Sequence, residues 1–227
     1  MLQKYGDSTA IYSEKGNLSY REFFSHAYNA AEVISRYVPE RTAVAVLVEK
    51  SVELFISANA IVLSNRIYAP LDNELPTETA VECIRAMNAS AVIADKEWSK
   101  RLKDKYQLKV LEVDELMSDN AKEADFREMS SSPDDIFCII HTSGSTGRPK
   151  GVGIRQYGLM SCLSYTNEIF GTTSDDCTLA ITNHCHDMSL YDIFGIFIKG
   201  GSVAIPYGVS SVSYTHLRAH ETSLHLV

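Results

Sequence analysis

A loop rich in glycine and hydroxyl side chains is the part of this sequence best suited to chemistry. Residues 141–151 read HTSGSTGRPKG, and the apolar residues 136–140 lead directly into them. Glycines let backbone N–H groups approach a ligand closely, hydroxyls add neutral donors, and Lys150 adds a positive charge. We therefore predict a polyphosphate-binding loop after a buried strand, in preference to an ordinary surface turn.

The loop differs from the two best-known nucleotide-binding patterns. A Walker A sequence needs a glycine directly before its lysine, whereas here Pro149 precedes Lys150. The dinucleotide pattern G-x-G-x-x-G occurs nowhere in the chain. Neither of these two kinds of site is therefore expected.

The remaining sequence predicts the elements that position this loop. Ser19 and Glu22 form a capping box before a helix whose apolar residues recur at helical spacing. A second capping box, of Ser189 and Asp192, is expected to open a helix to about residue 199. Strands are expected at residues 9–12, 42–48, 67–71, 91–94, 109–113, 177–182 and 201–206, helices at 51–65, 77–88, 96–105 and 157–170, and an exposed loop at 118–135. This alternation predicts an α/β fold of βαβ units with mainly parallel sheets.

Composition and charge restrict the class of protein. The 227 residues are 45% apolar, enough for one sizeable core, and a net charge of −8 without a basic stripe argues against nucleic acid as a partner. Since no apolar run has the length of a signal peptide or a membrane span, no membrane association is expected. Five cysteines without C-x-x-C spacing indicate reduced thiols in a cytoplasmic protein: Cys83, Cys138, Cys162, Cys177 and Cys185.

Four segments, in the right order, resemble the adenylate-forming (AMP-binding) enzymes. The loop is similar to their phosphate signature T-S-G-S-T-G-x-P-K-G, and residues 18–23 (LSYREF) to L-T-Y-x-E-L. Residues 63–76 (LSNRIYAPLDNELP) resemble L-x-A-G-x-A-Y-x-P-L-D, although Asn65 and Arg66 stand where small residues are usual. Residues 186–195 (HDMSLYDIFG) resemble F-D-x-S-V-x-D/E-I-F. The resemblance is closest to amino-acid adenylation domains of nonribosomal peptide synthetases, and it implies the N-terminal part of their large subdomain.

The resemblance also implies cofactors and phosphate-binding residues. ATP and Mg²⁺ are the expected cofactors, and Thr142 and Lys150 are the expected catalytic residues. The loop residues expected to hold the nucleotide phosphates are Thr142, Ser143, Gly144, Ser145, Thr146, Gly147 and Lys150.

The last of the four segments implies an amino-acid site. Asp187 matches the aspartate that holds the substrate ammonium group by a charge-assisted hydrogen bond. Asp187 could instead cap the next helix, but the predicted Ser189–Asp192 box already supplies a cap. His186, Met188 and Tyr191 match pocket positions, with plain core packing as an equal alternative for Met188 and Tyr191, and with His186 replacing the usual aromatic residue.

A metal site is the main alternative for this segment. His184 and His186 share one face of an extended chain, with Cys185 and Asp187 beside them. Zinc needs three or four ligands, and no second ligand cluster is visible in the sequence. We therefore expect no metal site of this kind.

The resemblance implies a two-step ligase. An amino-acid carboxylate is activated by ATP as its adenylate with release of pyrophosphate, and then passes to the phosphopantetheine thiol of a carrier protein. The alternatives are a D-alanine–carrier-protein ligase, an acyl-CoA synthetase-type ligase, and a non-catalytic nucleotide-binding remnant.

The sequence also suggests how much of such an enzyme is present. Residues 1–210 are expected to form a truncated large subdomain. Residues 211–227 (SVSYTHLRAHETSLHLV) resemble no part of the family and read as a disordered or artefactual tail, such as translated adapter sequence, with a native extension as the alternative. The family's Y-G-x-T-E segment and its C-terminal lysine domain do not occur here, so the 227 residues alone are expected to be inactive.

Overall fold

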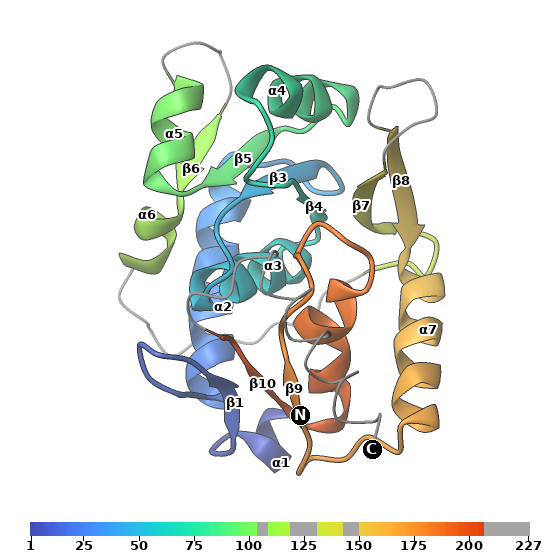
Figure 1. Ribbon diagram of the computed structural model, residues 1–227. Helices are drawn as coiled ribbons and strands as arrows, with labels where there is room; N and C mark the ends of the chain where they lie inside the picture. The colour runs from blue at the N-terminus through green and yellow to red at the C-terminus, as the bar shows by residue number, and fades with distance from the viewer. Residues whose placement is uncertain (104–108, 119–130, 143–149, 207–227) are drawn as a thin grey trace, which may run out of the picture.

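The computed structural model describes residues 1–103, 109–118, 131–142 and 150–206, which form two β-sheets with helices on and between them (Figure 1). The strands are β1 Thr9–Tyr12, β2 Leu18–Ser19, β3 Ala43–Leu47, β4 Ile67–Pro70, β5 Ala91–Ala94, β6 Val110–Glu112, β7 Ile136–Thr142, β8 Lys150–Arg155, β9 Cys177–Leu179 and β10 Ser202–Ala204. The helices are α1 Leu2–Tyr5, α2 Tyr20–Tyr37, α3 Val52–Leu63, α4 Thr77–Ala86, α5 Lys96–Lys103, α6 Val113–Ser118, α7 Gln156–Ile169, the π-helix η1 Tyr191–Gly195 and the 3₁₀-helix η2 Ile196–Lys199.

The predicted α/β fold with mainly parallel sheets is confirmed. The larger sheet has the order β6-β5-β3-β4-β7-β8, and the smaller one β2-β1-β10-β9. In the larger sheet only the β7–β8 pair is antiparallel, and in the smaller one only β1–β2. Strand β8 was not predicted, because every residue of it except Ile154 is exposed and two of its six residues are glycines, which are depleted in strands.

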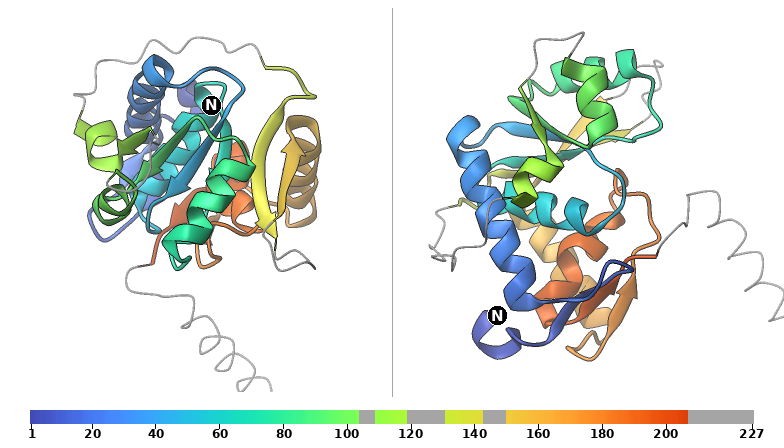
Figure 2. Two further views of the ribbon diagram at one scale, coloured as in Figure 1. Left: turned by 90° about the horizontal axis from the view of Figure 1, so that it is seen from above. Right: turned by 90° about the vertical axis from the view of Figure 1, so that its left-hand side faces the viewer.

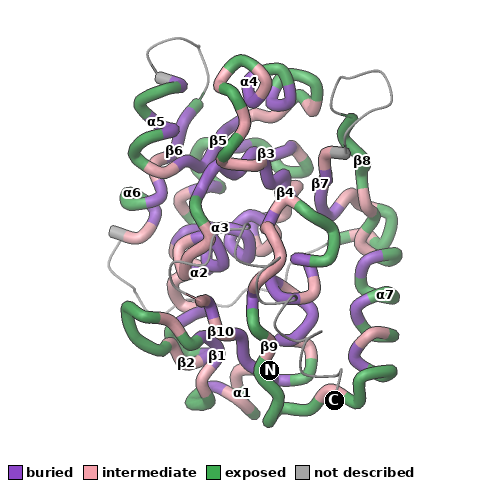
Figure 3. Tube along the Cα trace, in the orientation of Figure 1, coloured by how far each residue is buried: buried purple, intermediate pink, exposed green. Residues whose placement is uncertain are grey.

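The core lies on both faces of the larger sheet. Val44, Val46 and Val48 belong to the cluster shared with α2, α3 and the smaller sheet, whereas Ala45 and Leu47 face α4 and α5. Figure 2 shows these layers, with α3 between the two sheets, and Figure 3 shows buried residues along β3 and β5 and exposed ones along β8. Because β3 is buried on both faces, it reads as a continuous apolar run.

Helix α2 ties the smaller sheet to this core. Its predicted capping box is confirmed, since the Ser19 side chain accepts from the Glu22 N–H and Glu22 accepts from the Ser19 N–H at 2.8 Å. On its buried face, the Phe23 ring lies 5.2 Å from that of Phe197 in η2. The Tyr20 hydroxyl donates to the Gly201 carbonyl beside β10. The segment that leads into β10 is thus held against α2.

The second predicted capping box is wrong. The Ser189 hydroxyl donates to the carbonyls of His184 (2.9 Å) and His186 (2.6 Å), so it caps no helix N–H. Asp192 instead accepts from the Thr178 hydroxyl of β9 at 3.1 Å. In place of the expected α-helix there is a π turn followed by a 3₁₀ turn, and neither polar side chain caps a helix N–H, because Ser189 bonds preceding carbonyls and Asp192 bonds Thr178.

Two further points concern the extent of the fold. The predicted boundary at residue 210 and the tail 211–227 lie outside the described residues. None of the helices within the described ranges has both the length and the apolar character needed to cross a lipid bilayer.

Candidate functional site

The ends of β7 and β8 bring two of the predicted phosphate-binding residues together. Thr142 is the last residue of β7, Lys150 is the first of β8, and the two are cross-strand partners. Lys150 is exposed, so its ammonium group is available to a ligand. The other predicted loop residues lie outside the described residues: Ser143, Gly144, Ser145, Thr146 and Gly147.

The predicted amino-acid segment lies at the same end of the larger sheet, where the parallel strands β4 and β7 have their carboxyl ends. His184 is buried, and its Nε2–H donates to the Leu71 carbonyl, just past β4, at 3.1 Å. Strand β4 pairs in parallel with β7 through Tyr68 and Cys138, so Leu71 is level with His141 near the end of β7. The carboxyl ends of neighbouring parallel strands are where α/β folds bind ligands. The fold therefore places His184, and the start of the segment that follows it, near the carboxyl ends of β4 and β7, where Thr142 ends its strand.

Three of the four predicted substrate residues form an exposed turn. His186, Asp187 and Met188 are all exposed, Met188 to 73%. The Asp187 carboxylate accepts the Met188 N–H at 2.8 Å. Core packing is therefore excluded for Met188. Because the Ser189–Asp192 box does not exist, the presence of another cap is no longer a reason to exclude a capping role for Asp187.

The fourth predicted residue, Tyr191, is half-buried and differently engaged. Its hydroxyl donates to Asn167 Oδ1 at 2.9 Å and lies 3.0 Å from Thr172 Oγ1. Sequence reasoning missed both partners. Asn167 is 1% exposed on α7, and its only signal was a polar residue within the apolar face of a helix.

A group of ionisable side chains lies behind the exposed turn. Burial lowers the pKa of His184 to about 4, which keeps the imidazole neutral at neutral pH. Burial raises the pKa of Asp192 to about 6, and the Thr178 hydrogen bond and the charge of Lys50 oppose that rise. Burial also lowers the pKa of Lys50. No pattern in the sequence marks Lys50, whose effect on the pKa of Asp192 arises only because the fold brings the two side chains near each other.

The side chains considered for a metal site bind protein atoms instead. The Cys185 thiol donates to Asn183 Oδ1 at 3.3 Å, and the inner nitrogen of His184 is used on Leu71. In the part of the chain that the structure describes, no three His, Cys, Asp or Glu side chains are grouped so as to hold a metal ion. The exposed side chains of the segment are those of His186, Asp187 and Met188.

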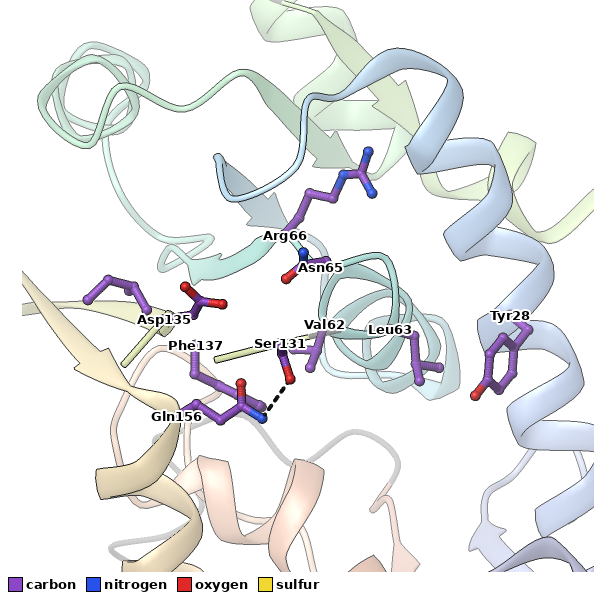
Figure 4. A pocket seen from close by; sticks show the side chains of 10 residues that line it. Tyr28, Val62, Leu63, Asn65, Arg66, Ser131, Asp135, Phe137 and Gln156 are labelled. Atoms are coloured by element: carbon purple, nitrogen blue, oxygen red, sulfur yellow. Dashed lines mark hydrogen bonds between the residues drawn. The ribbon is translucent and has the colours of Figure 1, made fainter. Parts of the chain in front are cut away.

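A separate cavity of about 260 Å³ lies at the opposite end of β7, where Ile136 and Phe137 begin the strand (Figure 4). Gln156 donates to the Ser131 hydroxyl at 3.1 Å beside it, while the Arg66 guanidinium points away and donates to the Val38 carbonyl at 3.0 Å. Since a strand rises about 3.3 Å per residue, this cavity is roughly 20 Å from Lys150. It is not part of the candidate phosphate site.

The same region explains the departure from the family pattern at Asn65 and Arg66. Asn65 has φ +60°, a left-handed conformation that asparagine tolerates and that suits the end of α3. Arg66 is 8% exposed, and its guanidinium satisfies backbone carbonyls at the end of α2. The larger residues are thus accommodated by the left-handed turn at Asn65 and by the hydrogen bond of Arg66 to the end of α2.

Comparisons with known proteins give this arrangement a context. The sequence profile of the family described as AMP-binding enzyme matches residues 2–222. FR901469 synthetase of Dothideomycetidae sp. (strain 11243) is 30% identical over 213 residues, which are 92% of this chain and 1% of that protein. Tyrocidine synthase 1 of Brevibacillus parabrevis is 28% identical over 205 residues, 89% of this chain and 19% of that protein. The chain thus spans less than a fifth of the length of either curated relative.

Solved structures match as well. The nonribosomal peptide synthetase FmoA3, in a form bound to alpha-methyl-L-serine-AMP, aligns with a TM-score of 0.78 and 26% identity over 90% of this chain and 23% of its own. The N-terminal subdomain of Klebsiella oxytoca NpsA aligns with a TM-score of 0.82 and 24% identity over 97% of this chain and 55% of its own. The NpsA match supports the fold alone.

Proposed function

Because the chain belongs to the AMP-binding enzyme family, we propose that it forms the phosphate loop and part of the amino-acid pocket of an adenylating ligase. The ligase activates an amino-acid carboxylate as its adenylate and passes the aminoacyl group to the phosphopantetheine thiol of a carrier protein. One observation carries the proposal. The exposed Asp187 turn and the strand ends at Thr142 and Lys150 lie at one edge of the larger sheet.

The phosphate end of the site needs positive charge and hydrogen-bond donors. The substrate carboxylate attacks the α-phosphorus of ATP, a new oxygen–phosphorus bond forms, and the bond to the pyrophosphate oxygen breaks. Lys150 is placed to neutralise the charge that develops on the pyrophosphate, and Thr142 marks the start of the loop that holds it. The remaining donors in this proposal are Ser143, Gly144, Ser145, Thr146 and Gly147. Mg²⁺ supplies further charge neutralisation when it is bound with ATP.

The amino-acid end of the site needs a negative charge for the substrate ammonium group. Asp187 supplies it, on an exposed turn whose backbone is fixed by the Ser189 hydroxyl. His186 and Met188 flank that carboxylate, and Tyr191 presents its ring from η1. The curated relatives named above are peptide synthetases, and FmoA3 has been solved with an aminoacyl adenylate, which supports an amino acid as the substrate class.

The cellular setting follows from the cysteines. All five are free thiols, two of them buried and two exposed. Such a set suits a reducing compartment, and we place the protein in the cytoplasm.

Amino-acid-dependent ATP–pyrophosphate exchange tests the proposal. It should be measured on the 227-residue chain and on the complete open reading frame that contains it. We expect Lys150→Ala and Thr142→Ala to reduce exchange at least tenfold, while Lys199→Ala, at an exposed lysine on η2, leaves it unchanged. In whichever of the two proteins shows exchange, equal rates for Lys150→Ala and Lys199→Ala would refute the phosphate assignment.

A second variant separates the amino-acid site from the nucleotide site. Asp187→Asn keeps the oxygen that accepts the Met188 N–H but removes the charge. We expect exchange with amino acids to fall while binding of the ATP analogue AMPPNP stays unchanged. Asp175→Asn, at an exposed aspartate before β9, is the matched control. Nucleotide binding without exchange for any amino or carboxylic acid would instead identify a non-catalytic nucleotide-binding module.

A further inference from the structure

The π turn η1, which carries Tyr191, is held by two buried asparagines from different helices. Asn59 of α3 donates to the Ile193 carbonyl at 3.3 Å, and Asn167 of α7 donates to the Gly195 carbonyl at 2.9 Å. The two side chains are 7% and 1% exposed. π turns are rare in proteins and occur frequently at functional sites. The two amides therefore fix the backbone that presents Tyr191.

Asn167 does more than Asn59, because it also binds the Tyr191 side chain. Its Oδ1 accepts the Tyr191 hydroxyl at 2.9 Å while its Nδ2 donates to Gly195. The Thr172 hydroxyl, just after α7, lies 3.0 Å from the same phenol oxygen. One buried amide thus joins the backbone at the end of η1 to the side chain at its start.

The ring of Tyr191 is confined as well as its hydroxyl. A Cβ at Gly195 would lie 2.7 Å from Tyr191 Cδ2, so only glycine leaves room for the ring in this position. The Phe170 ring, at the end of α7, packs edge-on against it with the ring centroids 6.4 Å apart. Hydrogen bonds and packing together leave the ring one orientation.

We propose that Asn167 is a positioning residue for substrate selection, acting with Thr172 by holding Tyr191 against η1. The inference rests on the proposed function, in which Tyr191 lines the amino-acid pocket. Since the Tyr191 hydroxyl is already hydrogen-bonded to Asn167 and Thr172, it is not available to donate to the substrate. The substrate therefore contacts a fixed aromatic ring. A fixed ring in the pocket discriminates between substrate side chains of different size, and a ring that can rotate away discriminates less well.

The test is a binding profile measured by calorimetry on the full chain. The probes are aminoacyl sulfamoyl adenosines, stable analogues of aminoacyl adenylates, with side chains of graded size. We expect Asn167→Leu to reduce the affinity ratio between the best and second-best probe about tenfold. Asn59→Leu is the matched control, because it removes a buried amide from the same turn without touching Tyr191. It should lower the unfolding midpoint to a similar degree and leave the ratio unchanged.

The outcomes separate this inference from the proposed function. Wild-type chain that binds no probe contradicts the proposed function, and the inference falls with it. Wild-type chain that binds with a clear preference, and Asn167→Leu with the same ratio, overturns the inference alone. If Asn167→Leu does not fold, Thr172→Val removes one of the two contacts to Tyr191 at similar volume. We then expect a smaller loss of the ratio, and an unchanged ratio overturns the inference.

Discussion

The centre of the larger sheet and the segment from His184 to Lys199 are stabilised by different forces. Strands β3 and β5 are buried at every position and are held by apolar contacts on both faces. The segment shares that apolar core through buried residues such as Ile193 and Phe197, but single hydrogen bonds from distant elements also hold it, such as those from Asn59, Asn167 and Thr178. Apolar burial is non-directional, whereas these bonds place particular atoms. The sheet therefore supplies the stability, and the polar segment sets the position of the substrate residues.

The largest expected effect comes from the sheet. Ile93 in β5 is completely buried, and Ile93→Ala removes its contacts and leaves a cavity. We expect a loss of about 2–5 kcal/mol in the free energy of unfolding, measured by urea denaturation. Ile169→Ala is the matched control, because Ile169 is 61% exposed on α7 and should change stability by no more than about 0.5 kcal/mol. Equal losses in both variants would contradict the assignment of the core.

A smaller effect is expected when a buried amide of the polar segment is removed. Asn59→Leu leaves the Ile193 carbonyl without its donor, and we expect a loss of about 1–3 kcal/mol in the same assay. Asn29→Leu is the control, since the Asn29 amide nitrogen is buried in α2 and has no hydrogen-bond acceptor among the described residues. That replacement should be neutral or stabilising. A loss in Asn29→Leu as large as in Asn59→Leu would show that the hydrogen bond is not what matters.

Of the two predicted capping boxes, only the one formed by Ser19 and Glu22 is present, and its contribution to stability can be tested. We expect Ser19→Ala to cost about 1 kcal/mol, because it removes a side-chain acceptor from the N-terminus of α2. Glu22→Ala removes the reciprocal bond and should cost less. No loss of helix stability in Ser19→Ala would show that this box contributes nothing in solution, despite its geometry.

These two regions also differ in how well the sequence predicts them. Continuous apolar runs gave β3 and β5, and the Ser19–Glu22 pair gave the start of α2, because those signals are local. The turn η1 was misread since its stabilising contacts join residues far apart in the chain, such as Asn59 and Ile193. The family was identified correctly from four short segments. The roles of Asn167 and Lys50 could not be predicted, because nothing near them in sequence marks their partners.

A further expected effect is a change in the pH dependence of stability. The pKa of Asp192 is raised from an ordinary 3.8 to about 6 in the folded protein. Between these pH values the folded state keeps a proton that the unfolded chain has released, so this group lowers stability as the pH rises from about 4 to 6. We expect Asp192→Asn to become more stable relative to the wild type as the pH rises over that range. Above the range, the difference in stability between the two proteins should stay constant.

The matching group in the same cluster acts with the opposite sign. The pKa of His184 falls from 6.5 to about 4 on folding, so its contribution to stability grows as the pH rises over a similar range and is lost on acidification. Urea denaturation of the wild type and Asp192→Asn between pH 4 and 7 therefore separates the two contributions. The variant shows the pH dependence of stability caused by His184 without that of Asp192. Parallel stability curves for the two proteins would contradict the buried position of Asp192.

The central claim is that the loop between β7 and β8 binds the phosphates of a nucleotide, and one measurement tests it most directly. AMPPNP with Mg²⁺ is titrated by calorimetry into the wild-type chain, Lys150→Ala and Lys199→Ala. Since a hydrogen bond to a charged group is worth about 1.5–3 kcal/mol, we predict saturable binding that Lys150→Ala weakens about tenfold or more and Lys199→Ala leaves unchanged. Equal affinity in all three proteins, or no binding by the wild type, would contradict the account.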